Sequence, residues 1–154
     1  MSPRPLLLFV AAIALAAAGT AAGIALFSDS RADADRDRLQ SEAFDLAVEA
    51  VTWARTPALL GGGDGTRALR QLDLKRLGTT PGRDADGEFL AREGATLRFR
   101  DLDTDTPSVL AANADGSLAV RLAVLGPDTA CITPVELEAD LDGDSAPEGC
   151  ASWR

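Results

Sequence analysis

The sequence contains no histidine and no tyrosine among its 154 residues, and it has only two cysteines and one lysine, Lys75. Without histidine, the chain cannot form a Ser–His or Cys–His nucleophilic pair, or a histidine-ligated zinc site. It also lacks a glycine-rich phosphate loop and an internal repeat. Carboxylates, hydroxyls and two cysteines remain for chemistry, and no pattern places paired carboxylates beside a nucleophile. We therefore expect that the protein is not an enzyme.

Positive charge is also scarce. The formal net charge is −9, and the isoelectric point is about 4.4. A nucleic-acid-binding surface needs clustered basic residues, so we expect no nucleic acid partner. Hydrophobic residues make up 46% of the chain, which is enough for a compact core, and the length suits one domain plus an anchor.

What the sequence does have is a long uncharged run near its beginning. Residues 6–27 read LLLFVAAIALAAAGTAAGIALF. As a helix this run would be about 33 Å long, close to the thickness of a bilayer core. It contains Gly19 and Gly23, and small residues four positions apart let helices pack closely. We interpret the run as a transmembrane helix with Gly19 and Gly23 as helix-packing positions.

A cleaved secretory signal is the competing interpretation of this run. Nine of its residues are alanine, which makes its insertion into lipid modestly favourable. Arg4 supplies the positive charge that precedes the apolar part of a signal peptide, and ALA at 14–16 or AAA at 16–18 could precede a cleavage site. No cysteine follows the run, so we do not expect a lipoprotein.

The helical pattern continues beyond the apolar run. A stripe of apolar residues recurs at spacings of three and four, and four neighbours widen it: Leu39, Ala43, Leu46, Ala50 and Trp53, with Phe44, Ala47, Val48 and Val51. Asp33 and Arg36 are oppositely charged neighbours on such a helix. Pro57 and the three glycines at 61–63 end the pattern. We expect one helix from about Leu6 to about Arg55.

The remainder of the chain reads as a small antiparallel sheet. Residues 66–78 indicate a short helix or turn that ends at Gly78. Runs with alternating apolar residues then follow at 87–94, 95–102, 108–116 and 117–126, and 130–142 is a further candidate strand. Asp-Gly within 112–117 indicates a hairpin. The predicted fold class is α+β with about four strands, divided into a helix half at 1–27, an amphipathic half at 28–57 and a sheet domain at 58–154.

This order of elements resembles type IV pilins and type II secretion pseudopilins. The resemblance rests on GIALF at 23–27, the charged helix after it, Pro57 and LGGG at 60–63. It implies a structural subunit of an extracellular filament or pseudopilus. Such a subunit would be anchored in the inner membrane with its C-terminal domain outside the cytoplasm. Its partners would be copies of itself and other pilin-like subunits, bound through the N-terminal helix.

The chain departs from that family at the processing site. Pilins resemble one another in a prepilin-peptidase motif and in a glutamate within the apolar segment. Residues 6–27 contain no acidic residue and no such motif, so we expect no processing by that peptidase. The alternative function is a periplasmic or secreted binding module, with a signal peptide or membrane anchor and no filament assembly.

The two cysteines are Cys131 and Cys150. An even pair in an exported chain indicates one disulfide, and two buried thiols are the alternative. The disulfide would attach the C-terminal loop to the sheet, as in the pilin-like pattern.

The loop between the cysteines is acidic. Asp140, Asp142 and Asp144 are spaced like the first ligands of an EF-hand calcium loop. Ser145 replaces the required glycine and Ala151 the last glutamate, which excludes a complete EF-hand. We expect either a shorter calcium turn, completed by Glu148 or by carbonyl groups, or an acidic loop exposed to solvent. No other cofactor is predicted. Asp101, Asp103 and Asp105 have the same spacing, but we interpret them as a strand end and turn.

Overall fold

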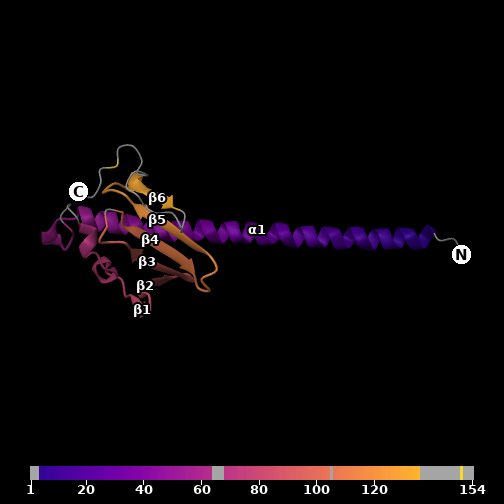
Figure 1. The fold of residues 1–154 in the computed structure, drawn as a ribbon, viewed down its shortest axis with the longest axis horizontal. Helices are drawn as coiled ribbons and strands as arrows, with labels where there is room; N and C mark the ends of the chain where they lie inside the picture. Colours follow the sequence, from indigo (N-terminus) through magenta and orange to yellow (C-terminus); the bar gives the residue numbers. More distant parts are fainter. Residues whose placement is uncertain (1–3, 64–67, 105, 136–149, 151–154) are drawn as a thin grey trace. The chain divides into compact units, whose positions relative to one another are not determined.

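Helix α1 and a six-stranded antiparallel sheet form the described part of the chain in the computed structural model (Figure 1). The structure describes residues 4–63, 68–104, 106–135 and 150. The predicted α+β fold class is confirmed. The helix and strands are α1 (Arg4–Arg55), β1 (Gly82–Asp84), β2 (Gly87–Arg92), β3 (Ala95–Arg100), β4 (Ser108–Asn113), β5 (Ala119–Val124) and β6 (Ile132–Val135). Short 3-10 helices are η1 (Ala58–Leu60), η2 (Ala68–Gln71), η3 (Leu74–Leu77) and η4 (Thr129–Cys131).

Helix α1 ends where the sequence predicts. The Thr56 amide still donates to the Thr52 carbonyl at 3.1 Å, and Pro57 then interrupts the helix because it has no N–H to donate. Gly61 adopts a left-handed conformation with φ of 84°. A Cβ atom on Gly62 would lie 2.2 Å from the carbonyl oxygen of Thr56. The glycine block therefore allows the chain to fold back tightly against the end of α1.

The strands of the sheet follow one another in chain order, and each pairs antiparallel with the next. The β4–β5 hairpin turns at the predicted Asp-Gly, where Gly116 has φ of 72° and its amide donates to the Asn113 carbonyl at 3.0 Å. A short connection of this kind is available only to antiparallel neighbours, so the meander follows from the predicted turns.

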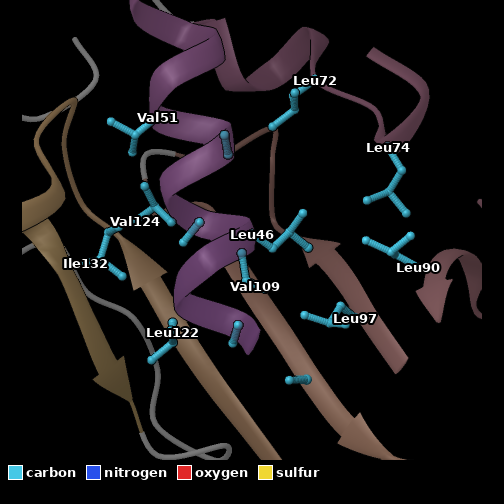
Figure 2. Packing of buried hydrophobic residues seen from close by; sticks show 14 of the residues in the cluster. Leu46, Val51, Leu72, Leu74, Leu90, Leu97, Val109, Leu122, Val124 and Ile132 are labelled. Carbon is cyan, nitrogen blue, oxygen red and sulfur yellow. The ribbon is translucent and has the colours of Figure 1, made fainter. Parts of the chain in front are cut away.

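The main core lies between one face of the sheet and the C-terminal part of α1. Figure 2 shows Leu46 and Val51 of the helix over Leu97, Val109 and Leu122 of the sheet. Side chains alternate between the two faces of a strand, so these strand positions all point to the helix side. The predicted stripe on α1 is buried at each of its five positions: Leu39, Ala43, Leu46, Ala50 and Trp53.

The structure corrects two details of the sequence analysis. Phe44, expected to widen the buried stripe, is 40% exposed. It follows Ala43 by one residue, which places it about 100° further round the helix and at the margin of the buried face. The second detail is β1, which was not predicted. It is three residues long and reads GRD, so it has none of the apolar alternation that marks the other strands.

The chain divides into two compact units, Met1–Asp35 and Arg36–Arg154. The second unit contains the sheet, its 3-10 helices and the part of α1 that carries the buried stripe. The first consists of the apolar run and the start of the charged segment.

Candidate functional site

The apolar part of α1 exposes its large side chains. Phe9, Ile13, Leu15, Ile24 and Phe27 are each more than half exposed, and Phe27 reaches 79%. The most apolar 18-residue window of this helix has a mean hydropathy of 2.1, so by length and composition it could cross a membrane. A signal sequence near the N-terminus has the same character. No other part of the described chain buries these side chains. A helix that is apolar on all sides is buried by lipid or by other helices.

Gly19 and Gly23 lie on one face of that apolar part, four residues apart. No other segment of the described chain comes within 4 Å of where a Cβ atom would stand on either glycine. The surface at these positions is therefore open to a neighbouring helix. Thr20 donates its hydroxyl to the Ala16 carbonyl at 2.9 Å, which satisfies this polar side chain within the helix itself.

The second unit contains an open groove of about 430 Å³ beside α1. Its lining comes from three elements: the last turns of α1, the η3 region and the end of β2. The lining residues are Val48, Glu49, Thr52, Trp53, Thr56, Arg76, Leu77, Thr79 and Arg92. A volume of this order is typical of clefts that accept ligands or side chains of partners.

Two arginines give the groove a positive edge. Arg92 binds Glu49 of α1 at 3.0 Å, which joins the end of β2 to the helix. The Arg76 guanidinium lies over the Trp53 ring, 5.9 Å from its centroid, a distance compatible with a cation–π contact. Glu49 offsets the charge of Arg92, whereas no carboxylate in the described ranges forms an ion pair with Arg76. Among the described residues that line the groove, Arg76 and Arg92 therefore outnumber the single carboxylate, Glu49.

Trp53 connects the groove to the η1 loop, which we define as residues 57–63. Its indole Nε1 donates to the Gly61 carbonyl at 2.9 Å, and its own carbonyl accepts from the Gly63 amide at 3.0 Å. The loop thereby presents Leu59 and Leu60 outward, and they are 99% and 77% exposed. These are the most exposed large apolar side chains in the described part of the second unit.

The two cysteines form a disulfide, Cys131–Cys150. Cys131 is buried with Ala123 and Leu125 in a second, smaller cluster, and Val135 and Cys150 pack against it. Ala123 lies between Leu122 and Val124 on β5, and both of those neighbours belong to the main core. Because side chains alternate along a strand, the disulfide cluster lies on the sheet face opposite the helix.

The predicted calcium ligands Asp140, Asp142, Asp144 and Glu148 lie outside the described residues. Within the described ranges, no three acidic or cysteine side chains gather in a way that could hold a metal ion. Asp101 lies just after β3, and its carboxylate binds Arg121 and accepts from the Ser108 hydroxyl at 3.4 Å. These contacts engage Asp101 in the sheet and agree with its interpretation as a strand end.

The sheet face opposite the helix carries a second ion pair, between Asp84 of β1 and Arg98 of β3. Arg98 Nη1 donates to Asp84 Oδ1 at 2.8 Å, and the guanidinium lies 5.2 Å from the Phe89 ring centroid. The hydrogen bond between the two side chains lowers the pKa of Asp84 and raises the pKa of Arg98. The pair ties the short β1 to the centre of the sheet, since Arg98 is reached across β2.

Sequence reasoning missed the groove and the exposed leucines. Arg76 and Leu77 belong to η3 and Arg92 belongs to β2, and no spacing in the sequence links these elements to Trp53 of α1. One feature of the sequence could have indicated that Leu59 and Leu60 are exposed. They stand between a proline and three glycines, outside any helix or strand pattern. Apolar residues in such a turn have no regular element to bury them.

Comparison with known proteins places the chain in no family: no family model, curated protein or solved structure matches it.

Proposed function

We propose that this protein is a pilin-like structural subunit of an extracellular filament or pseudopilus. It is held in the inner membrane or in the filament by the apolar part of α1, and it displays the acidic sheet domain outside the cytoplasm. It has no catalytic activity, and its partners are copies of itself and other pilin-like subunits. The observation that carries this proposal is that one helix exposes apolar side chains in its N-terminal part and packs on the sheet with its C-terminal part.

Helix α1 supports the proposal because its composition changes while the helix continues. The N-terminal part exposes apolar side chains on all sides, and the C-terminal part buries one stripe against the sheet. A long helix, a small antiparallel sheet and a C-terminal disulfide are compatible with a pilin-like fold. The open surface at Gly19 and Gly23 supports close contact with neighbouring helices.

The first experiment is the intact mass of the native protein in membrane and sheared-surface fractions. A mass that begins at Met1 or Ser2 and ends at Arg154, present in both fractions, supports an unprocessed filament subunit. A mass that begins between Ala17 and Gly23 contradicts it, because the apolar segment was then a signal peptide. That result would favour the alternative function, a periplasmic or secreted binding module.

A helix-packing test separates assembly from simple anchoring. Replacing both Gly19 and Gly23 by leucine places bulk on the open face, so we expect severalfold less cross-linking between neighbouring α1 helices. The matched control is Ala21→Leu, which adds bulk to the other side of the same segment. Equal cross-linking in the glycine variant and the control contradicts packing through Gly19 and Gly23. A protein that is monomeric and fully soluble in its host contradicts the filament role itself.

A further inference from the structure

Strand β6 is the last strand of the described sheet. It pairs with β5 on one side, and no strand in the described ranges pairs with its other side. An open sheet edge presents a row of backbone N–H and C=O groups, and a strand from another chain can pair with them. The groups that β6 presents on its open side therefore decide whether a second chain can extend the sheet.

The register of β6 shows which of its residues face the open side. The Leu125 amide donates to the Cys131 carbonyl at 2.9 Å, so these two residues form a hydrogen-bonded pair across the ladder. Hydrogen-bonded and non-hydrogen-bonded pairs alternate along an antiparallel ladder. Thr133, two residues after Cys131, therefore bonds to β5. Ile132 and Pro134, on either side of Thr133, have their backbone groups directed away from β5.

The pairing of β5 with β4 leads to the same directions. The Val124 amide donates to the Pro107 carbonyl at 2.8 Å, so Val124 bonds toward the β4 side of the sheet. Leu125 is the next residue, and its backbone groups point the other way, toward β6. Both ladders therefore agree on which residues of β6 face the open edge.

Neither of the two outward-facing residues offers a free amide. Pro134 has no N–H to donate, and the Cδ atom of its ring stands where an amide hydrogen would point. The Ile132 amide donates to the Thr129 carbonyl of η4. Pro134 is exposed, so its ring meets any strand that approaches this edge. Such a strand finds carbonyl acceptors on β6 but no donor.

The opposite edge of the described sheet is β1, and its protection is different. It is three residues long, and its two charged residues, Arg83 and Asp84, are exposed. Short edge strands and charged side chains both discourage pairing between sheets. The two edges of the described sheet thus share one property, although the residues that produce it are unrelated.

We propose that the backbone of β6 is a built-in block against strand addition, and that Pro134 is its central residue. The sheet domains of neighbouring copies then do not join edge to edge, even where they are held close together. Copies of the chain can still meet through α1. This inference goes beyond the proposed function, because it concerns the sheet alone and holds whether or not α1 enters a filament.

Restoring the missing donor tests the block directly. Pro134→Val in the full chain, in detergent micelles, should raise the self-association constant about tenfold in sedimentation velocity. Two antiparallel β6 strands would then each donate one new hydrogen bond to the other. The matched control is Thr133→Val, which also places valine on β6 but at a position whose amide already bonds to β5. Association through α1 is the same in all these proteins and does not obscure the difference.

Amide hydrogen exchange locates the contact and tests the second part of the block. In Pro134→Val, the amide at position 134 should become protected as the protein concentration rises. In the original protein, the Ile132 amide should exchange at least about tenfold more slowly than in an unfolded chain, because it donates to Thr129. Exchange of the Ile132 amide at the unfolded-chain rate overturns the proposal, since β6 would then offer a free donor.

A second variant keeps the test independent of folding defects. Pro134→Ala restores the amide with a smaller side chain, and near-ultraviolet circular dichroism verifies the fold of each variant. Unchanged self-association of the folded variants overturns the proposal. An equal rise in Thr133→Val also overturns it, because the cause would then be apolar surface and not the donor. The intact mass in the membrane fraction reports on α1 separately, so this failure is distinguishable from failure of the filament role.

Discussion

Leu15 and Leu46 belong to the same helix, α1, yet Leu15 is 75% exposed and Leu46 is fully buried. Around Leu46, charged and apolar residues alternate with the helical period, so one stripe finds the sheet. Around Leu15, every neighbour is apolar, and the described chain offers none of them a partner. A helix with one apolar face can bury that face against its own chain. A helix that is apolar on all sides needs lipid or other chains to bury its side chains.

The largest expected difference between the two parts of α1 comes from making the same substitution in each. Leu46→Ala should lower the free energy of unfolding of the sheet domain by about 3 kcal/mol, because it leaves a cavity in the core. Leu15→Ala should change it by less than about 0.5 kcal/mol. Denaturant unfolding in micelles, followed by tryptophan fluorescence, measures both. Similar losses of unfolding free energy in the two variants would mean that the two parts of α1 unfold in one cooperative transition.

A charge introduced into each part of α1 should have different effects on membrane association. Leu15→Arg should remove the protein from the carbonate-resistant membrane fraction, because an arginine near the centre of a spanning helix costs about 3 kcal/mol. Phe44→Arg is the control, since Phe44 is already 40% exposed at the margin of the sheet domain. Equal membrane retention of both variants would show that the apolar part is not the anchor.

The disulfide allows a test confined to the sheet domain. Replacing Cys131 and Cys150 together by serine should lower the free energy of unfolding by about 3 kcal/mol, because the bond closes a loop with a sequence separation of 19. Membrane association should stay unchanged. Intact-mass analysis with and without reduction verifies the bond in the native protein, and two free thiols there would contradict the structure.

The smallest expected effect concerns Asp84 and Arg98. Because Arg98 lowers the pKa of Asp84 below the usual value of 3.8, the pair stabilises the folded state above that value and ceases to do so as the pH falls through the lowered pKa. Asp84→Asn should therefore be less stable than the original protein near neutral pH, and this difference should shrink progressively as the pH falls below 3.8. A difference that is constant with pH would mean that the effect is not ionic.

Much of the fold was accessible from local pattern. The period-three-and-four stripe predicted the helix and its buried face, and the Asp-Gly at 115–116 predicted the β4–β5 hairpin. These signals work because they depend on residues close in sequence. Strand β1 escaped because its three residues carry no alternation, and it is held by the distant Arg98. The exposure of Phe44 was not predicted, because burial at the margin of a helical stripe depends on what packs beside it.

The amino-acid pattern alone indicated that α1 changes from apolar to amphipathic without a break, that two cysteines were available to pair, and that histidine chemistry was excluded. Which residues from separate elements come into contact became visible only in the three-dimensional fold. It brought Arg76 onto Trp53 and Arg92 onto Glu49 to form the groove, and it left Leu59 and Leu60 outside the core. The physical reason is that periodicity encodes which face of an element is apolar, whereas burial also requires a surface to cover it, and that surface comes from residues far away in the chain.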